Sequence, residues 1–92
     1  MDLALESAAR LFRALGDESR LRLLEFLIKK ESNVTDISLK MNEGISTISQ
    51  RLRLLRSEGL VKRRREGKHF FYSLTDSHIQ NLISNAIEHA LE

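Results

Sequence analysis

Residues 76–92 contain two pairs of side chains whose types and spacing suit a metal ion. Asp76 and His78 form one pair, and His89 and Glu92 form the other. Imidazole nitrogens and carboxylate oxygens are common ligands of tetrahedral zinc, at about 2.0–2.2 Å from the ion. If these residues lie on one helix, His78 and His89 are roughly 16 Å apart along its axis. One helix therefore cannot bring both pairs to the same ion.

Two copies of this helix can do so. Successive helical residues are rotated by about 100°, which puts His78 and His89 on nearly the same face. In an antiparallel pair of helices, Asp76 and His78 of one chain would lie beside His89 and Glu92 of the other. The spacing therefore predicts a homodimer with two symmetry-related sites. The donor atoms suit Zn(II), with Co(II) or Ni(II) as further candidates. Because a histidine must be neutral to bind, zinc affinity should decline below about pH 6.5.

An alternative is that these four side chains are only solvated residues at helix ends. We expect Glu92 to be the weakest ligand, because the last residues of a chain fray. Glu88 is a poor replacement, since it points about 100° away from the adjacent His89. Four protein ligands leave zinc no open position for catalysis, and the sequence has no nucleophile motif. We therefore do not expect an enzyme, such as a small zinc hydrolase.

The composition predicts a small cytoplasmic domain without thiol chemistry. A chain of 92 residues is expected to form one domain over residues 1–92, and dimerisation would add to its modest stability. The absence of Cys excludes disulfides and thiolate metal sites. No run of eighteen apolar residues is present and the N-terminus does not resemble a signal peptide, so we expect no membrane partner.

Basic residues are concentrated in one part of a chain whose net charge is only +2. Residues 51–68 hold eight of the fifteen, against only Glu58 and Glu66: Arg51, Arg53, Arg56, Lys62, Arg63, Arg64, Arg65 and Lys68. Lys and Arg often only solvate a surface. A block this dense on a nearly neutral protein is instead typical of a surface that binds a polyanion such as DNA.

The apolar spacing predicts a mostly α-helical chain with one β-hairpin. Helices are expected over residues 3–15, from the capping residue Asp17 to a break at Ser32-Asn33, over 34–41, over 45–57, and from a cap at Thr75 or Asp76 to the end. The runs 60–66 and 69–74, the second rich in aromatic residues, flank Gly67 and predict two strands.

The helix over 45–57 has two different faces. We expect Ile45, Ile48, Leu52 and Leu55 to face the core. Short polar side chains, an amide and an arginine lie on the opposite side: Ser46, Thr47, Ser49, Gln50 and Arg53. Two helices joined by a short turn with Gly44, the second presenting such a face, predict a helix-turn-helix whose second helix enters a DNA groove. Gln50 is best placed to read a base edge.

The hairpin that follows is expected to act as a wing beside this helix. Its basic side chains are candidates for phosphate contacts: Arg63, Arg64, Arg65 and Lys68. They cannot all face DNA, because alternate residues of a strand point to opposite sides. His69 lies on the wing and is expected to contact phosphate or pack, not to bind metal.

With these residues placed, the chain resembles the ArsR/SmtB family of metal-responsive winged-helix repressors over nearly its whole length. The resemblance rests on Leu15-Gly16-Asp17 followed by Arg20 and leucines, on Ile45–Leu52 as recognition helix, and on Gly59–Tyr72 as strand-wing-strand. The pattern Asp-x-His with His-x-x-Glu is similar to the zinc site that some members carry on the last helix. Two departures are that Asn33 and Thr35 stand where many relatives have Cys, and Gln50 where many have His.

Together these patterns predict a repressor controlled by a metal ion. The apo homodimer, paired through its first and last helices, should bind an inverted-repeat operator, and Zn(II) should lower its DNA affinity. The first helix would contribute Leu3, Leu11, Phe12 and Leu15, and the last helix is expected to turn inward Ile79, Leu82, Ile83, Ala86, Ile87 and Ala90. The resemblance implies that the regulated genes serve metal efflux or storage. The alternative is a winged-helix regulator whose metal site is vestigial or purely structural.

Overall fold

The computed structural model describes residues 2–92, which form a helical body and a small antiparallel sheet. The helices are α1 (Leu3–Leu15), α2 (Glu18–Lys29), α3 (Val34–Met41), α4 (Ile45–Ser57) and α5 (Ser77–Ala90). The strands are β1 (Ser32–Asn33), β2 (Val61–Glu66) and β3 (His69–Leu74), in the sheet order β1-β3-β2. The expected mostly helical fold with a hairpin wing is confirmed.

Short polar side chains fix where most of the helices begin. Asp17 accepts a hydrogen bond from the backbone N–H of Arg20 at 2.9 Å and caps α2. Asn33 caps α3 through the N–H of Asp36, and Asp76 caps α5 through the N–H of Ile79 at 3.0 Å. Asp76, not Thr75, is therefore the cap of the last helix. Thr75 instead donates its hydroxyl to the carbonyl of Gly59.

The core lies where α2, α3, α4 and the base of the hairpin meet. Its fully buried side chains come from four helices and the turn before β2: Leu23, Leu24, Ile37, Ile48, Leu52, Leu55, Leu60 and Ile83. One face of α4 packs into this core through Ile48, Leu52 and Leu55, which recur at helical spacing. The polar face of α4 is therefore left outside the core.

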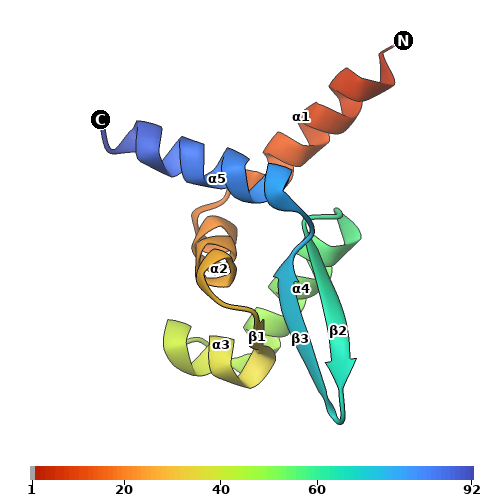
Figure 1. The fold of residues 1–92 in the computed structure, drawn as a ribbon, viewed down its shortest axis with the longest axis vertical. Helices are drawn as coiled ribbons and strands as arrows, with labels where there is room; N and C mark the ends of the chain where they lie inside the picture. The colour runs from red at the N-terminus through yellow and green to blue at the C-terminus, as the bar shows by residue number, and fades with distance from the viewer. Residues whose placement is uncertain (1) are drawn as a thin grey trace.

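The elements form two layers with a projecting hairpin (Figure 1). Helices α1 and α5 cross at the top and run outward in different directions, so the two termini lie far apart. Helices α2, α3 and α4 lie below them, and the hairpin of β2 and β3 extends down one side to a free tip. Within residues 2–92, no helix is both long and apolar enough to cross a membrane.

The structure corrects several expectations about single residues. Ser32-Asn33 is not only a break between helices, because it pairs with Tyr72 and Phe71 as a third strand. Ile45 is 54% exposed, since the first residue of α4 lies at the periphery of the core. Ala86 and Ala90 are exposed in the protomer rather than inward, whereas Ile87 between them packs against the core. Leu15 is buried within the protomer.

Candidate nucleic-acid interface and metal ligands

The polar face of α4 is open along its length. The five side chains expected to enter a groove are all exposed: Ser46, Thr47, Ser49, Gln50 and Arg53. Gly44, at the start of α4, has no side chain that could cap the helix. The first backbone N–H groups of α4 therefore have no side-chain acceptor. A helix with free N–H groups at its start and short polar side chains on its open face suits the edge of a nucleic acid.

An ion pair fixes the turn between α3 and α4. Arg51 donates to the Glu43 carboxylate at 2.6 Å, from α4 back to the turn. This hydrogen bond lowers the pKa of Glu43 and raises that of Arg51. Asn42 adopts the left-handed conformation with φ of 55°, which ends α3 sharply. Arg51 therefore stabilises the orientation of α4 and is not part of the open face.

The wing carries basic side chains on both of its faces. Arg63 and Arg65 lie on the face that also holds the buried Tyr72, whereas Lys62 and Arg64 lie on the other face. The Arg63 guanidinium lies 4.0 Å from the centroid of the Phe70 ring. Arg65 donates to the carbonyl of Gly67 at 3.0 Å, which folds it over the tip.

Arg64 differs from the other wing arginines. Its Nε and one terminal nitrogen donate to the same Glu31 oxygen at 3.0 and 2.8 Å, and its other terminal nitrogen donates to Glu66. Its guanidinium also lies 4.9 Å from the centroid of the Phe71 ring. The hydrogen bonds to Glu31 and then Glu66 raise the pKa of Arg64 above its ordinary value. The remaining wing cations have no carboxylate partner among residues 2–92: Lys62, Arg63, Arg65 and Lys68.

The four metal-binding side chains predicted from the sequence lie in two pairs at opposite ends of α5. The Nδ1 atom of His78 is 3.8 Å from Oδ1 of Asp76, and Nδ1 of His89 is 3.7 Å from Oε1 of Glu92. Two ligands of a tetrahedral zinc ion are about 3.3–3.4 Å apart, given ordinary bond lengths. The two histidine side chains are 92% and 84% exposed, so a small rotation of each meets no packing barrier.

The types of donor atom suit zinc, but each end of α5 in one protomer offers only two of the four predicted ligands. Asp76 uses Oδ1 to cap α5, which leaves Oδ2 for a metal. In the part of the chain that the structure describes, no three His, Cys, Asp or Glu side chains of one protomer gather closely enough to hold an ion. A site with three or four protein ligands therefore needs a second copy.

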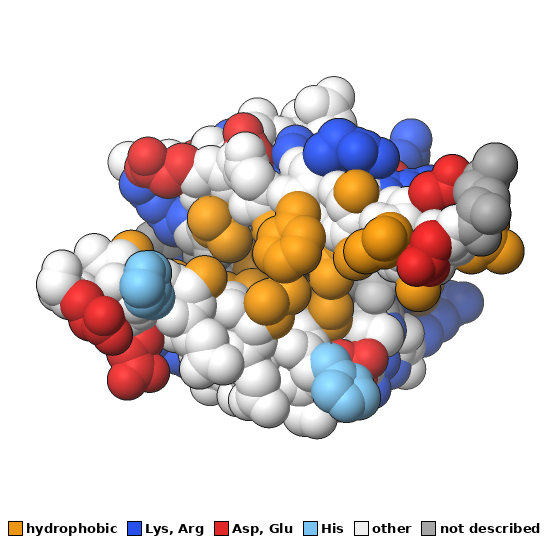
Figure 2. Space-filling model, turned by 90° about the horizontal axis from the view of Figure 1, so that it is seen from above, with side chains coloured by type: hydrophobic (Ala, Val, Ile, Leu, Met, Phe, Trp, Pro, Cys, Tyr) orange, Lys and Arg blue, Asp and Glu red, His pale blue; other side chains and the backbone are white. Residues whose placement is uncertain are grey.

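The face formed by α1 and α5 is apolar in its middle and polar at its ends. Figure 2 shows hydrophobic side chains gathered across this face, with two histidines near its edges. Leu3 and Phe12 of α1 are 70% and 58% exposed, which is unusual for such large apolar side chains. An uncovered apolar face on a small domain is typical of a surface that another protein chain covers.

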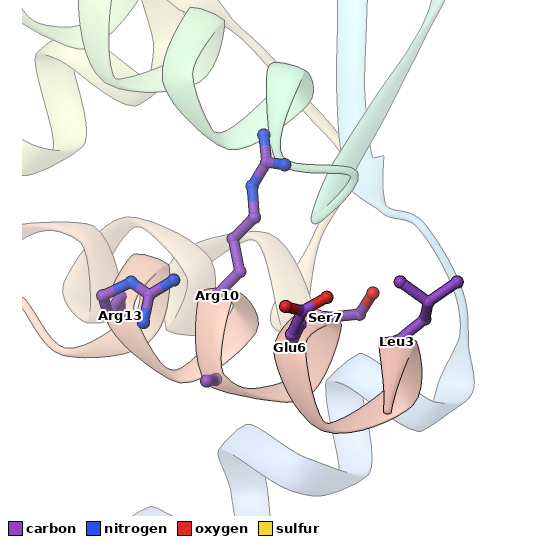
Figure 3. A pocket seen from close by; sticks show the side chains of 6 residues that line it. Leu3, Glu6, Ser7, Arg10 and Arg13 are labelled. Atoms are coloured by element: carbon purple, nitrogen blue, oxygen red, sulfur yellow. The ribbon is translucent and has the colours of Figure 1, made fainter. Parts of the chain in front are cut away.

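The other flank of α1 reaches the end of α4. A surface groove of about 430 Å³ follows this flank and is lined by α1 alone: Leu3, Glu6, Ser7, Ala9, Arg10 and Arg13 (Figure 3). Arg10 points from it toward α4 and binds Glu58 at 2.8 Å. This pair raises the pKa of Arg10. It connects the helix with the exposed apolar side chains to the end of the helix with the open polar face.

The helix-turn-helix of α3 and α4, followed by a basic hairpin, defines a winged helix-turn-helix protein of the DNA-binding type. Residues 17–63 match the arsR family of bacterial regulatory proteins, and the chain belongs to this family. The resemblance found in the sequence is thereby confirmed, as is the expectation that the protein is a regulator and not an enzyme.

Relatives and solved structures agree with this assignment. The chain is 42% identical to a transcriptional repressor SmtB homolog of Synechocystis sp., covering 95% of this chain and 66% of that protein. It is 36% identical to a cadmium resistance transcriptional regulatory protein CadC homolog of Staphylococcus aureus, covering 91% of this chain and 70% of that protein. The chain thus spans about two thirds of the length of these relatives.

A solved homodimeric winged helix-turn-helix DNA-binding domain from Mycobacterium bovis has the same fold. Its TM-score is 0.88 at 31% identity, over 95% of this chain and 81% of that one.

Sequence reasoning missed the ion pairs that organise the basic surface. Glu31 and Arg64 are 33 residues apart, and Arg10 and Glu58 are 48 apart. No local pattern relates such positions, so only the folded chain reveals the pairing. The aromatic residues Phe70 and Phe71 were a usable signal of the cation–π contacts on the wing, because two adjacent Phe residues are unusual on a solvent-exposed hairpin.

Proposed function

We propose that the protein is a metal-responsive transcriptional repressor that acts as a homodimer. The apo dimer binds an inverted-repeat operator, and Zn(II) binding between the two α5 helices lowers its DNA affinity, which releases expression of metal efflux or storage genes. The observation that carries this proposal is the placement of two histidine–carboxylate pairs at opposite ends of α5, on either side of an uncovered apolar face.

The arrangement of donors supports a site shared between protomers. An antiparallel α5 pair would bury exposed apolar side chains and bring Asp76 and His78 of one copy to His89 and Glu92 of the other. Imidazole and carboxylate ligands favour zinc among common ions, with cobalt and nickel as further candidates. The SmtB and CadC homologs are named as a transcriptional repressor and a cadmium resistance regulator. The first name agrees with repression and the second with a response to a metal ion.

DNA binding would use α4 and the wing. Ser46, Thr47, Ser49, Gln50 and Arg53 would face a major groove, while the free cations of the wing would contact phosphates. Two copies of α4 in a dimer would read half-sites about 34 Å apart, which predicts a palindromic operator.

Metal would act by holding the two protomers in one relative orientation. If that orientation spaces the α4 helices wrongly for the operator, DNA and zinc oppose one another, and each weakens the other by the same factor. On the protein side, Arg10 and Glu58 link α1 of this interface to the end of α4.

The test is fluorescence anisotropy of an operator fragment from the protein's own promoter, titrated with apo protein and then with Zn(II). We expect apo protein to bind and stoichiometric zinc to release it. His78→Gln and His89→Gln should bind DNA normally but resist release by zinc. Glu88→Gln is the matched control, because it removes an exposed carboxylate from the same helix without removing a predicted ligand.

Two results would favour the alternatives. Release of the His89→Gln variant by zinc at the wild-type concentration would refute the ligand assignment. Tight zinc binding with no change in DNA affinity would instead indicate a structural metal site. The absence of tight zinc binding would indicate a vestigial site.

A further inference from the structure

We propose that Arg64 positions the wing for DNA through Glu31 and does not itself contact phosphate. The inference rests on the proposed DNA-binding function and concerns how the wing takes part in it. It changes the role expected from the sequence, in which Arg64 is one of four candidates for phosphate contacts that cannot all face DNA.

The first argument is that all three nitrogens of the Arg64 guanidinium already donate to carboxylates, which leaves only two of its five N–H bonds unused. Nε and one terminal nitrogen donate to Glu31, the remaining nitrogen donates to Glu66, and one face of the group lies over Phe71. Two carboxylates around one guanidinium give the cluster a net charge of −1. A phosphate that approached Arg64 would meet this negative charge, so the cluster repels DNA.

The second argument is the position of the cluster in the fold. Strand β1 pairs with β3 only at Tyr72 and Phe71, so the hairpin is joined to the body no further than Phe71. Arg64 lies directly opposite Phe71 in the register. It reaches across that ring to Glu31, which precedes β1, and so connects all three strands at the level where the sheet narrows to two.

Beyond this level the hairpin has no other support. Every residue from Arg65 to Phe70 is exposed, so no buried side chain holds the outer wing. Of the cations without carboxylate partners, Arg65 and Lys68 lie in this unsupported part, whereas Lys62 and Arg63 lie opposite Ser73 and Tyr72, nearer the body. The direction in which Arg65 and Lys68 point therefore depends on the clamp at the base of this part, formed by Glu31, Arg64 and Phe71.

The deciding variant is Glu31→Gln, because the two possible roles of Arg64 predict opposite changes in operator affinity. If Arg64 bound phosphate, removing its carboxylate partner would free the guanidinium and strengthen DNA binding. If Arg64 positions the wing, the same change weakens binding although it adds positive charge. We expect operator affinity of the apo protein to fall on the order of tenfold, and the slope of log affinity against log salt to decrease by about one or two as wing contacts are lost.

A second variant uses the difference between arginine and lysine. Arg64→Lys keeps the charge but loses the planar fork that binds Glu31 and Glu66 together. We expect it to behave like Glu31→Gln, whereas a phosphate-binding residue would be largely rescued by lysine. The double variant Glu31→Gln/Arg64→Gln should bind no worse than Arg64→Gln alone, because both changes break one clamp. A purely global destabilisation would lower the melting temperature without changing the salt slope of the folded protein.

Two controls separate this inference from the proposed function. Glu88→Gln adds the same charge far from the wing and should leave affinity unchanged or slightly higher. Lys68→Gln should lower the salt slope by about one. If wild type binds and Lys68→Gln behaves so, but Glu31→Gln binds more tightly, only the positioning role of Arg64 is overturned. If wild type binds no operator DNA at any salt concentration, the proposed function itself fails.

Discussion

At the scale of single residues, the side chain that we propose reads sequence is Gln50. It is exposed at the middle of the open face of α4, and an amide group can donate to and accept from an adenine edge at once. Its neighbours Ser49 and Arg53 are exposed on the same face and can contact a base or a phosphate. Sequence preference should therefore depend mainly on one amide.

We expect Gln50→Ala to weaken operator binding by about 1–3 kcal/mol while binding to random DNA stays nearly constant. The reason is that the change removes a base contact and leaves every cation in place. Fluorescence anisotropy with operator and scrambled duplexes measures the ratio of the two affinities. Gln80→Ala, on the exposed side of α5, is the matched control. Equal loss on both duplexes would show that Gln50 contacts the backbone instead.

Asp76 combines two roles that different substitutions can separate. Asp76→Asn keeps an N-cap but removes the carboxylate, so zinc affinity should fall while stability remains close to wild type. Asp76→Ala removes both and should also lower the free energy of unfolding by about 0.5–2 kcal/mol. Urea unfolding and zinc titration measure the two effects. Loss of zinc binding only in the alanine variant would indicate that helix order, not the carboxylate, matters.

At the scale of elements, most of the fold follows from local patterns. The helix α4 was predictable because Ile48, Leu52 and Leu55 recur at helical spacing, and α2 because Asp17 caps an apolar run. Strand β1 was not, since its two residues carry no periodicity and acquire their role from pairing with β3. Two donor pairs on α5 were visible in the sequence, whereas the clamp on Arg64 depends on long-range packing.

The ion pair of Glu43 and Arg51 at the turn between α3 and α4 should contribute less to the stability of the fold in acid. Because the Arg51 hydrogen bond lowers the pKa of Glu43 in the folded state, this ion pair stabilises the fold above the ordinary glutamate pKa of about 4.3 and is lost as pH falls through the lowered value. Glu43→Gln should therefore be less stable than wild type at pH 7, and the difference should shrink below about pH 4. Urea midpoints across this range test it. A constant difference would assign the effect to packing.

At the scale of the whole molecule, the exposed apolar face of α1 and α5 is the surface through which we propose that two copies pair. We expect Phe12→Asp to convert a dimer into a folded monomer, because a side chain 58% exposed in one protomer is not needed for its core. Operator affinity should fall on the order of a hundredfold, since two linked half-site contacts become independent. Light scattering after size exclusion measures the mass. Leu39→Asp, which charges a leucine 74% exposed on α3, is the control and should stay dimeric.

The sheet order also has a consequence for solubility. Strand β2 is an edge of the sheet, and its unpaired backbone N–H and C=O groups could accept a strand from another molecule. Lys62, Arg63, Arg64 and Arg65 follow one another along this edge, so two copies brought edge to edge would place like charges side by side. The basic residues of β2 thus also oppose aggregation of the free protein through its own wing.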